Sequence, residues 1–202
     1  MLKRVLVGTK QNSTKEKFVK KTLKILLIIF TILIFLIIGI RVLKIDRRIL
    51  MNLYPNEYSI YVEKYSEKYK VDKDIIFAII KNESNFENAV SSNKGAKGLM
   101  QLMEATANEV ADILELETIN LSDAETNIQL GTKYFSMLYQ KYNNTELALA
   151  AYNAGSGNVD KWIENGIISK NGENIENIPY KETNMYVRKV MQSIKFYELL
   201  YE

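Results

Sequence analysis

The sequence predicts an all-α protein in which a single transmembrane helix precedes one compact helical domain. Three observations lead to this fold class. An uncharged, strongly apolar run of sixteen residues lies near the N-terminus. The remaining chain repeats apolar residues at helical spacing, and no stretch alternates apolar and polar residues over five or more positions as a half-buried strand would. A length of 202 residues suffices for one domain and an appendage.

The apolar run covers residues 25–40 and reads ILLIIFTILIFLIIGI. A helix that crosses about 30 Å of hydrocarbon needs about 20 residues, and extension to 23–43 reaches this length. The extension brings in Lys24 and Arg41, whose long side chains can reach water from the two ends. We therefore predict a membrane anchor at 23–43.

Two alternatives to an anchor remain for this run. A cleaved signal peptide has an apolar region of about 7–15 residues followed by a small-residue cleavage site. Here no alanine precedes Ala78, and Arg41 follows the run directly. A buried core helix is the second alternative, but a run that is apolar on every face suits lipid better.

The charges of the chain are unevenly distributed. Residues 1–48 hold 12 Lys/Arg and 2 Asp/Glu, a net charge of +10, whereas residues 49–202 hold 15 and 22, a net charge of −7. The basic excess before the anchor predicts an N-terminus in the cytoplasm and the large domain outside a cell membrane that the chain crosses once. The acidic balance of that domain argues against a nucleic-acid partner.

These features divide the chain into four predicted parts. They are a basic cytoplasmic tail at 1–22, the transmembrane anchor at 23–43, a juxtamembrane linker at 44–57 and the globular domain at 58–202.

The chain has neither cysteine nor histidine. This excludes disulfides, thiol nucleophiles, Ser-His-Asp catalysis and the usual zinc ligands. Acid–base chemistry near neutral pH must come from a carboxyl group, a lysine or a tyrosine with a shifted pKa. The acidic residues are scattered without a calcium-loop pattern, so we predict no metal and no cofactor.

The globular domain is expected to contain six or seven helices. One should begin near Asp72 or Asp74 and carry an apolar stripe through Ile79 and Ile80 to Glu83. The other expected helices that can be bounded are 100–116, 123–142, 145–153, 159–164 and 183–201. The polar stretches 87–98, which contains two glycines, and 165–180 are expected to be loops.

Glu83 is an acidic residue on an apolar helical stripe, four residues after Ile79 and three after Ile80. Poor solvation raises the pKa of a carboxyl group, and a general acid must be protonated near neutral pH. A buried structural glutamate satisfied by hydrogen bonds is the alternative, and helix position alone favours it.

Four segments resemble, in the same order, segments of the soluble lytic transglycosylase family, whose catalytic domain has a goose-type-lysozyme-like fold. They are IIKNES at 79–84, SNKGAKGLMQL at 92–102, AAYNAG at 150–155 and IPYKETNMYV at 178–187. Family members often have a proline shortly after GLMQ, where this chain has Met103 and Glu104. Glu104 would favour the start of the following helix, since an acidic residue suits a helix N-terminus.

The resemblance implies a lysozyme-like catalytic domain that cleaves the β-1,4 bond between N-acetylmuramic acid and N-acetylglucosamine in peptidoglycan. Glu83 would act as general acid on the glycosidic oxygen and then as general base on the C6 hydroxyl of the muramic acid. The product would be a 1,6-anhydro sugar. One carboxylate would suffice, whereas a typical glycoside hydrolase needs two.

The resemblance also implies roles for other residues. Tyr186 would hydrogen-bond Glu83 and direct its proton. The remaining positions would bind the sugars: Ser92 and Gln101 through acetamido groups or hydroxyls, Met100 as an apolar wall, and Tyr152 and Asn153 as a stacking face and an amide. For Met100 and Tyr152, simple core packing is the alternative.

Two other functions remain open from the sequence. In a hydrolytic muramidase, Glu87, Glu104 or Asp123 would position a water molecule, although Glu87 is more simply explained as a solvated surface residue. In a non-catalytic peptidoglycan-binding subunit of an envelope complex, whose partners the sequence does not identify, Glu83 would need no acidic function.

Overall fold

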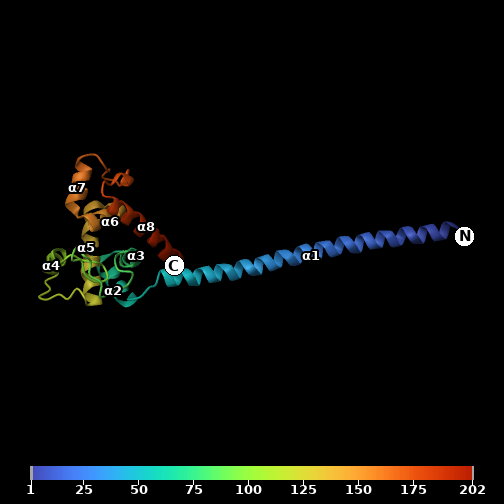
Figure 1. Cartoon of the computed structure of the whole chain (residues 1–202), viewed down its shortest axis with the longest axis horizontal. Coiled ribbons are helices and arrows are strands. Elements are labelled where there is room, and N and C mark those ends of the chain that lie inside the picture. The colour runs from blue at the N-terminus through green and yellow to red at the C-terminus, as the bar shows by residue number, and fades with distance from the viewer. Residues whose placement is uncertain (1, 202) are drawn as a thin grey trace. The chain divides into compact units, whose positions relative to one another are not determined.

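The computed structural model describes residues 2–201, with the side chains of 19–41 and 47–201. The chain divides into two compact units, Met1–Leu53 and Tyr54–Glu202. Figure 1 shows the first unit as a single helix and the second as a bundle of shorter helices.

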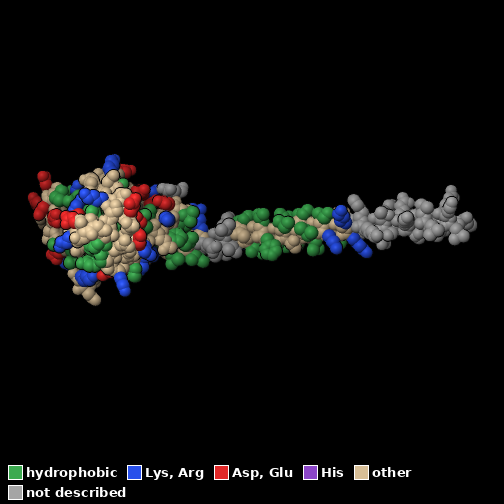
Figure 2. Space-filling model, turned by 90° about the horizontal axis from the view of Figure 1, so that it is seen from above, with side chains coloured by type: hydrophobic (Ala, Val, Ile, Leu, Met, Phe, Trp, Pro, Cys, Tyr) green, Lys and Arg blue, Asp and Glu red, His purple; other side chains and the backbone are tan. Residues whose placement is uncertain are grey.

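The first unit consists of helix α1 (Leu2–Leu53). Its stretch Val19–Arg41 is long and apolar enough to cross a membrane. The large apolar side chains of this stretch are exposed, and Figure 2 shows them as a column with Lys and Arg side chains at one end. Such a surface is unfavourable in water, so the helix indicates membrane association.

This stretch, Val19–Arg41, overlaps the anchor predicted at 23–43. The helix itself continues through most of the predicted linker, 44–57, because α1 ends only at Leu53. Most of the predicted basic tail, 1–22, lies outside the residues whose side chains the structure describes.

The second unit contains seven α-helices in its described residues, as the sequence predicts. They are α2 (Ser59–Tyr69), α3 (Lys73–Glu83), α4 (Glu104–Ile113), α5 (Ala124–Tyr142), α6 (Thr145–Ala154), α7 (Ser156–Glu164) and α8 (Lys181–Tyr201), with a 3-10 turn η1 (Ile175–Asn177) before α8. Residues 2–201 contain no extended strand, only isolated bridges that join Lys97 to Ser91 and to Leu102. The all-α prediction is confirmed.

The helix starts follow local capping chemistry. The Asp72 carboxylate accepts from the Asp74 N–H at 2.9 Å and so begins α3, and the Asp123 carboxylate accepts from the Thr126 N–H at 2.8 Å to begin α5. A side-chain acceptor at this position satisfies an N–H that has no partner inside the helix. Asn144 caps α6 in the same way.

The helix predicted at 100–116 is wrong in its first turn, since α4 begins at Glu104. Gln101 has a φ of 46°, in the left-handed region, and its neighbours form a turn. The N–H of Leu102 bonds across this turn to the carbonyl of Lys97 at 3.1 Å. Apolar spacing cannot separate such a buried turn from a helix. The expectation that Glu104 favours a helix start is confirmed.

The core forms where α3, α5, α6 and α8 meet. α3 packs most extensively on α8, and α5 on α6. The largest fully buried side chains include Ile76, Ile79, Ile80, Phe135, Leu149 and Tyr197. Because Ile76, Ile79 and Ile80 are fully buried, the end of α3, at Glu83, is held in a fixed position.

The end of α8 is fastened to the first residues of the same unit. The Tyr197 hydroxyl donates to the carbonyl of Pro55 at 2.9 Å, and the Tyr201 hydroxyl donates to that of Tyr54 at 2.8 Å. The last turns of α8 therefore lie at the point where the chain arrives from α1.

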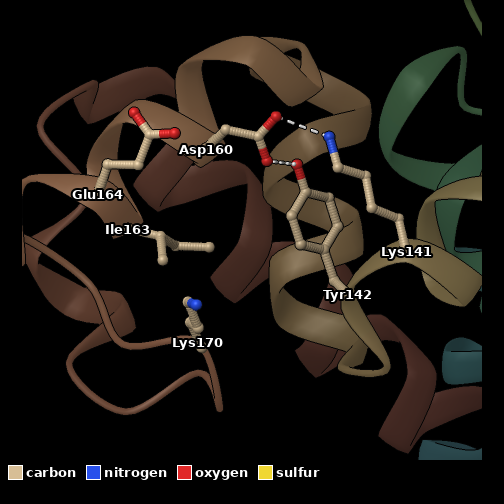
Figure 3. Close-up of a pocket in the computed structure, with 6 residues that line it drawn as sticks. All are labelled: Lys141, Tyr142, Asp160, Ile163, Glu164 and Lys170. Carbon is tan, nitrogen blue, oxygen red and sulfur yellow. Dashed lines mark hydrogen bonds and ion pairs between the residues drawn. The ribbon is translucent and has the colours of Figure 1, made fainter.

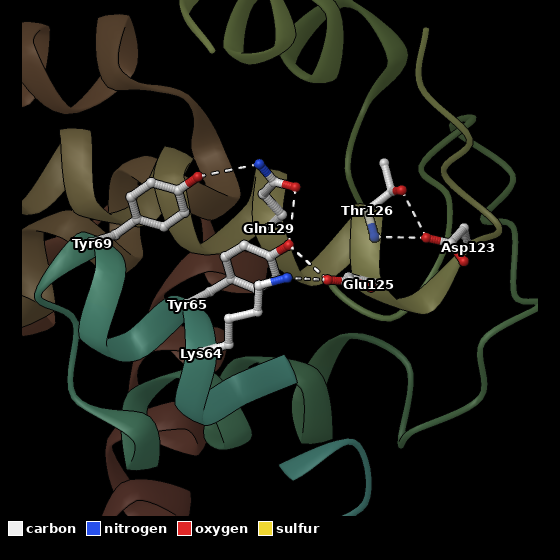
Figure 4. A network of polar contacts seen from close by, with 7 residues as sticks. All are labelled: Lys64, Tyr65, Tyr69, Asp123, Glu125, Thr126 and Gln129. Carbon is white, nitrogen blue, oxygen red and sulfur yellow. Dashed lines mark hydrogen bonds and ion pairs between the residues drawn. The ribbon is translucent and has the colours of Figure 1, made fainter. Parts of the chain in front are cut away.

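A polar network joins α2 to α5 at the surface (Figure 4). Lys64 pairs with Glu125 at 2.5 Å, and the Tyr65 hydroxyl lies 3.1 Å from both Glu125 and Gln129. The Lys64 and Glu125 side chains are 56% and 38% exposed. Ion pairs in such positions contribute little to stability.

We therefore expect Glu125→Gln to leave the thermal unfolding midpoint of the globular unit almost unchanged, because glutamine can still accept from Tyr65 and the lost ion pair is solvated. Differential scanning calorimetry at low and high salt measures this. A large drop in the midpoint would show that the network is a main support of the α2–α5 contact.

Candidate active site

Glu83 is the last residue of α3, and the chain turns sharply after it. Asn85 and Phe86 both have positive φ values, 51° and 67°. An aromatic residue in the left-handed region is strained, and burial of the Phe86 ring near Phe77, 6.4 Å between centroids, stabilises it. The turn brings the following loop, residues 84–103, back beside the Glu83 carboxyl.

A cavity of about 400 Å³ opens beside Glu83, and we call it the catalytic cavity. Five residues predicted for the site line it: Glu83, Ser92, Gln101, Tyr152 and Asn153. Five further lining residues were not predicted: Asn93, Lys94, Ala96, Met103 and Glu182. The cavity thus gathers residues from α3, the following loop, α6 and the start of α8, which lie far apart in the sequence.

The pKa of the Glu83 carboxyl is raised to about 7. Burial is the largest cause, because it disfavours the charged form. The nearby negative charge of Glu182 adds to the increase, and the Tyr186 hydroxyl opposes it by favouring the carboxylate. A carboxyl group with a pKa raised in this way can hold a proton near neutral pH and donate it, and its carboxylate is basic enough to accept one.

Tyr186 lies on α8 and is 8% exposed. Burial and the charge of Glu83 raise the pKa of its hydroxyl well above the usual value, so the hydroxyl stays protonated. It lies close enough to interact with Glu83, yet among the described residues no partner meets hydrogen-bond geometry with it. The two groups thus approach without a fully formed hydrogen bond.

Tyr152 lies at the cavity wall, whereas Met100 lies in the core behind it. Tyr152 lines the catalytic cavity, and its hydroxyl donates to the Met100 carbonyl at 2.8 Å. Met100 itself is fully buried and its sulfur packs toward Gly131, so it does not form the apolar wall suggested by the resemblance. Core packing, the alternative, describes Met100, and Met103 is the methionine that lines the cavity.

The polar lining residues are partly engaged within the protein. The Gln101 amide donates to the carbonyls of Val90 and Gly98, which leaves its oxygen as the group available to a ligand. The Ser92 hydroxyl accepts from the Ala96 N–H at 3.0 Å, and the Asn153 oxygen accepts from the Thr183 hydroxyl at 2.8 Å. These bonds fix each side chain at the cavity wall.

Asn127 on α5 is a supporting residue that the sequence analysis missed. It is fully buried, its oxygen accepts from the Met100 N–H at 2.8 Å, and its amide donates to the carbonyls of Lys97 and Leu121 at 3.0 Å each. It thereby holds the GLMQ turn against α5. The sequence did contain a signal for this role, because the Asn127 side-chain amide precedes Ile128 on the buried side of a predicted helix.

The three acidic residues considered for a hydrolytic mechanism do not line the catalytic cavity. Glu87 is exposed, Glu104 pairs with Lys97 at 3.3 Å, and Asp123 caps α5. Glu182 is the second carboxylate in the cavity, and it forms an ion pair with Lys94 at 3.1 Å.

A separate cavity of about 500 Å³ lies between α5, α7 and the loop after α7 (Figure 3). It contains none of the predicted site residues. In it, Asp160 accepts from the Tyr142 hydroxyl at 2.9 Å and pairs with Lys141 at 2.7 Å. These contacts fasten α5 to α7.

Comparison with known proteins identifies the family of the chain. The sequence model of the family described as transglycosylase SLT domain matches residues 60–174, more than half of the chain. The chain belongs to the transglycosylase SLT domain family. Its SLT domain contains the Glu83 helix, the GLMQ turn and the AYNAG helix, while the Tyr186 segment lies beyond the matched range.

The relatives of this SLT domain are named lytic murein transglycosylases. The chain is 34% identical to the soluble lytic murein transglycosylase of Escherichia coli K12 over 151 residues, 71% of this chain and 23% of that protein. It is 31% identical to the membrane-bound lytic murein transglycosylase C of Serratia proteamaculans, over 70% and 47% of the two chains. It spans about a quarter of the length of the soluble relatives.

Solved structures share the fold of the SLT domain. The 70 kDa soluble lytic transglycosylase of Escherichia coli superposes with a TM-score of 0.69 at 32% identity, covering 74% of this chain and 25% of that one. An inactive mutant of the lytic transglycosylase Slt from Pseudomonas aeruginosa gives 0.67 at 32% identity, over 73% and 25%. These matches confirm the lysozyme-like helical domain that the resemblance implied.

Proposed function

We propose that the chain is a peptidoglycan lytic transglycosylase that cleaves the bond between N-acetylmuramic acid and N-acetylglucosamine and leaves a 1,6-anhydro end. The observation that carries the proposal is the Glu83 carboxyl on the wall of the catalytic cavity, with its pKa raised to about 7 by burial. The names of the relatives support the same substrate.

In the proposed reaction, the protonated Glu83 donates its proton to the glycosidic oxygen, and the bond from that oxygen to C1 breaks. The resulting carboxylate then accepts the proton of the muramic-acid C6 hydroxyl, and the C6 oxygen bonds to C1. The carboxyl group ends protonated, as it began, and no water enters the products. The same group can serve as acid and then as base, because donation of its proton leaves a carboxylate whose raised pKa lets it take up the next proton.

The surrounding side chains have supporting roles in this proposal. Tyr186, whose hydroxyl stays protonated, stabilises the Glu83 carboxylate while it is charged. The Gln101 oxygen and the Asn153 amide offer an acceptor and a donor to the acetamido groups. Ser92 contributes its hydroxyl, and Tyr152 contributes the aromatic wall.

Product mass distinguishes the proposed reaction from hydrolysis. We expect the full chain to release muropeptides that are lighter by one water than hydrolytic products, because C6 replaces water as the nucleophile. Liquid chromatography with mass spectrometry of digested peptidoglycan measures this. Reducing ends alone would favour a muramidase, and wall binding without any release would favour a non-catalytic module.

The pH dependence of activity should follow Glu83. Its raised pKa means that the proton needed for the first step is lost as the pH rises through about 7. We therefore expect kcat/KM on soluble glycan fragments to fall on the alkaline side of this value. A profile that stays flat well above pH 7 would contradict the assignment of Glu83 as the general acid.

We also propose that α1 anchors the domain as a single-pass helix, with its N-terminus in the cytoplasm and the SLT domain outside. The apolar stretch Val19–Arg41, the excess of basic residues before it and the membrane-bound relatives support this. The chain has no cysteine, so a cysteine introduced for Glu115 would be a unique label site. This cysteine should react with a membrane-impermeant maleimide in intact cells. If it were protected from the reagent, the opposite orientation in the membrane would be indicated.

A further inference from the structure

The catalytic cavity has a neighbour, which we call the side cavity, of about 290 Å³. The side cavity is lined by Lys94, Asn153, Ala154, Tyr180, Lys181, Glu182 and Thr183. Three of these residues also line the catalytic cavity: Lys94, Asn153 and Glu182. They form the partition between the two cavities.

One part of this partition is fixed. Asn153 is held by the Thr183 hydroxyl at 2.8 Å, and Thr183 is only 2% exposed. The other part is the ion pair between Lys94 in the loop after α3 and Glu182 in the first turn of α8. Their side chains are 76% and 72% exposed. Exposed ion pairs are weak and are screened by salt, so this part can open at little cost.

The side cavity offers a surface suited to a sugar ring. Tyr180 is half exposed, and its ring packs nearly perpendicular to that of Trp162, 5.1 Å between centroids. A fixed aromatic face with hydrogen-bonding groups around it can bind the apolar face of a pyranose ring. Lys181 and Asn153 provide such groups. The side cavity would thus continue a glycan-binding groove if the partition opened.

We propose that the Lys94–Glu182 ion pair is a gate that decides how long a stretch of glycan the enzyme holds. With the pair closed, a bound strand stops at the partition, which favours short products cut from strand ends. With the pair open, the strand continues into the side cavity, which favours internal cuts and longer products. The glycan as ligand rests on the proposed function.

The test compares the full-length wild-type chain in detergent micelles with Lys94→Met, which keeps the length of the side chain and removes its charge. Lys97→Met is the matched control, because Lys97 lies in the same loop and pairs with Glu104 at 3.3 Å, and neither of these residues lines the two cavities. The measurement is the length distribution of products released early from peptidoglycan at low salt.

We expect Lys94→Met to raise the share of long products several-fold, and Lys97→Met to match the wild type. Added salt should move the wild type toward the Lys94→Met distribution and leave Lys94→Met unchanged, since salt screens the pair. Identical product lengths in Lys94→Met and wild type, or equal shifts in both variants, would overturn the gate.

A binding measurement tests the gate without any reaction. In the Glu83→Gln background, affinities are measured for chitooligosaccharides from the disaccharide to the hexasaccharide. With Lys94 present, the gain in affinity with length should level off, and with Lys94→Met it should continue to longer oligosaccharides. An equal length dependence overturns the gate. A difference in length dependence, together with a wild type that releases no anhydro ends, overturns only the proposed reaction.

Discussion

Glu83→Gln is expected to lower lytic activity by about 10³-fold or more, because one carboxyl group supplies both proton transfers of the proposed reaction. Glutamine has nearly the same shape but can neither donate a proton as an acid nor accept one as a base. Release of anhydro-muropeptides from peptidoglycan, followed by mass spectrometry, measures the loss.

The same substitution should not weaken the fold. The folded-state pKa of Glu83, about 7, lies above its ordinary value of 4.5, so its contribution to stability is complete below 4.5 and is lost as the pH rises through 7. Glutamine does not ionise. Well above pH 7, Glu83→Gln should therefore be more stable than the wild type, by up to about 3 kcal/mol.

Glu87→Gln provides the control, since Glu87 is exposed and does not line the catalytic cavity. It should retain wild-type activity and stability. If Glu87→Gln lost activity as Glu83→Gln does, two carboxylates would be required and the single-acid mechanism would fail. Chemical denaturation of both variants at low and high pH completes the comparison.

Gly98→Ala is expected to destabilise the SLT domain by about 2–5 kcal/mol and to reduce activity with it. Gly98 has a φ of 78°, and a Cβ atom there would lie 2.2 Å from the Asn127 amide nitrogen and 2.3 Å from the Leu121 carbonyl oxygen. The added methyl group would push Asn127 from the bonds that hold the GLMQ turn.

Gly95→Ala separates the effect of backbone strain from that of a steric clash with neighbouring atoms. Gly95 has a similarly positive φ, 90°, but no atom lies within 4 Å of a Cβ built there. We expect it to cost about 1 kcal/mol, from backbone strain alone. Denaturant titration of the two variants gives the difference, and equal losses would show that the contact with Asn127 is not what fixes this turn.

The sequence predicted the helices well where one face is apolar and a cap is available. Asp123 and Asn144 mark the starts of α5 and α6, and the stripe that ends at Glu83 defines α3. The prediction failed at residues 100–103, because a fully buried turn has the same apolar composition as a helix. Its shape depends on Asn127, whose bonds span 27 and 30 positions of the chain.

The candidate site divides in a similar way. Position on a stripe drew attention to Glu83, and resemblance to a family supplied its role and brought in Tyr152, Asn153 and Tyr186. Lys94 and Glu182 were missed because charged residues in exposed loops and first turns usually belong to the solvated surface. Only the three-dimensional structure shows that they meet across the groove, 88 residues apart.

The fastening of α8 to Tyr54 and Pro55 has a mechanical consequence. If α1 holds the chain while the SLT domain is bound to the wall, any pulling force enters the domain at Tyr54. The tyrosine hydroxyls pass it to the last turns of α8. Glu182 is in the first turn of this 21-residue helix, about 30 Å away at 1.5 Å per residue. Tension on the anchor would thus act first on the end of α8 that lies farthest from Glu182.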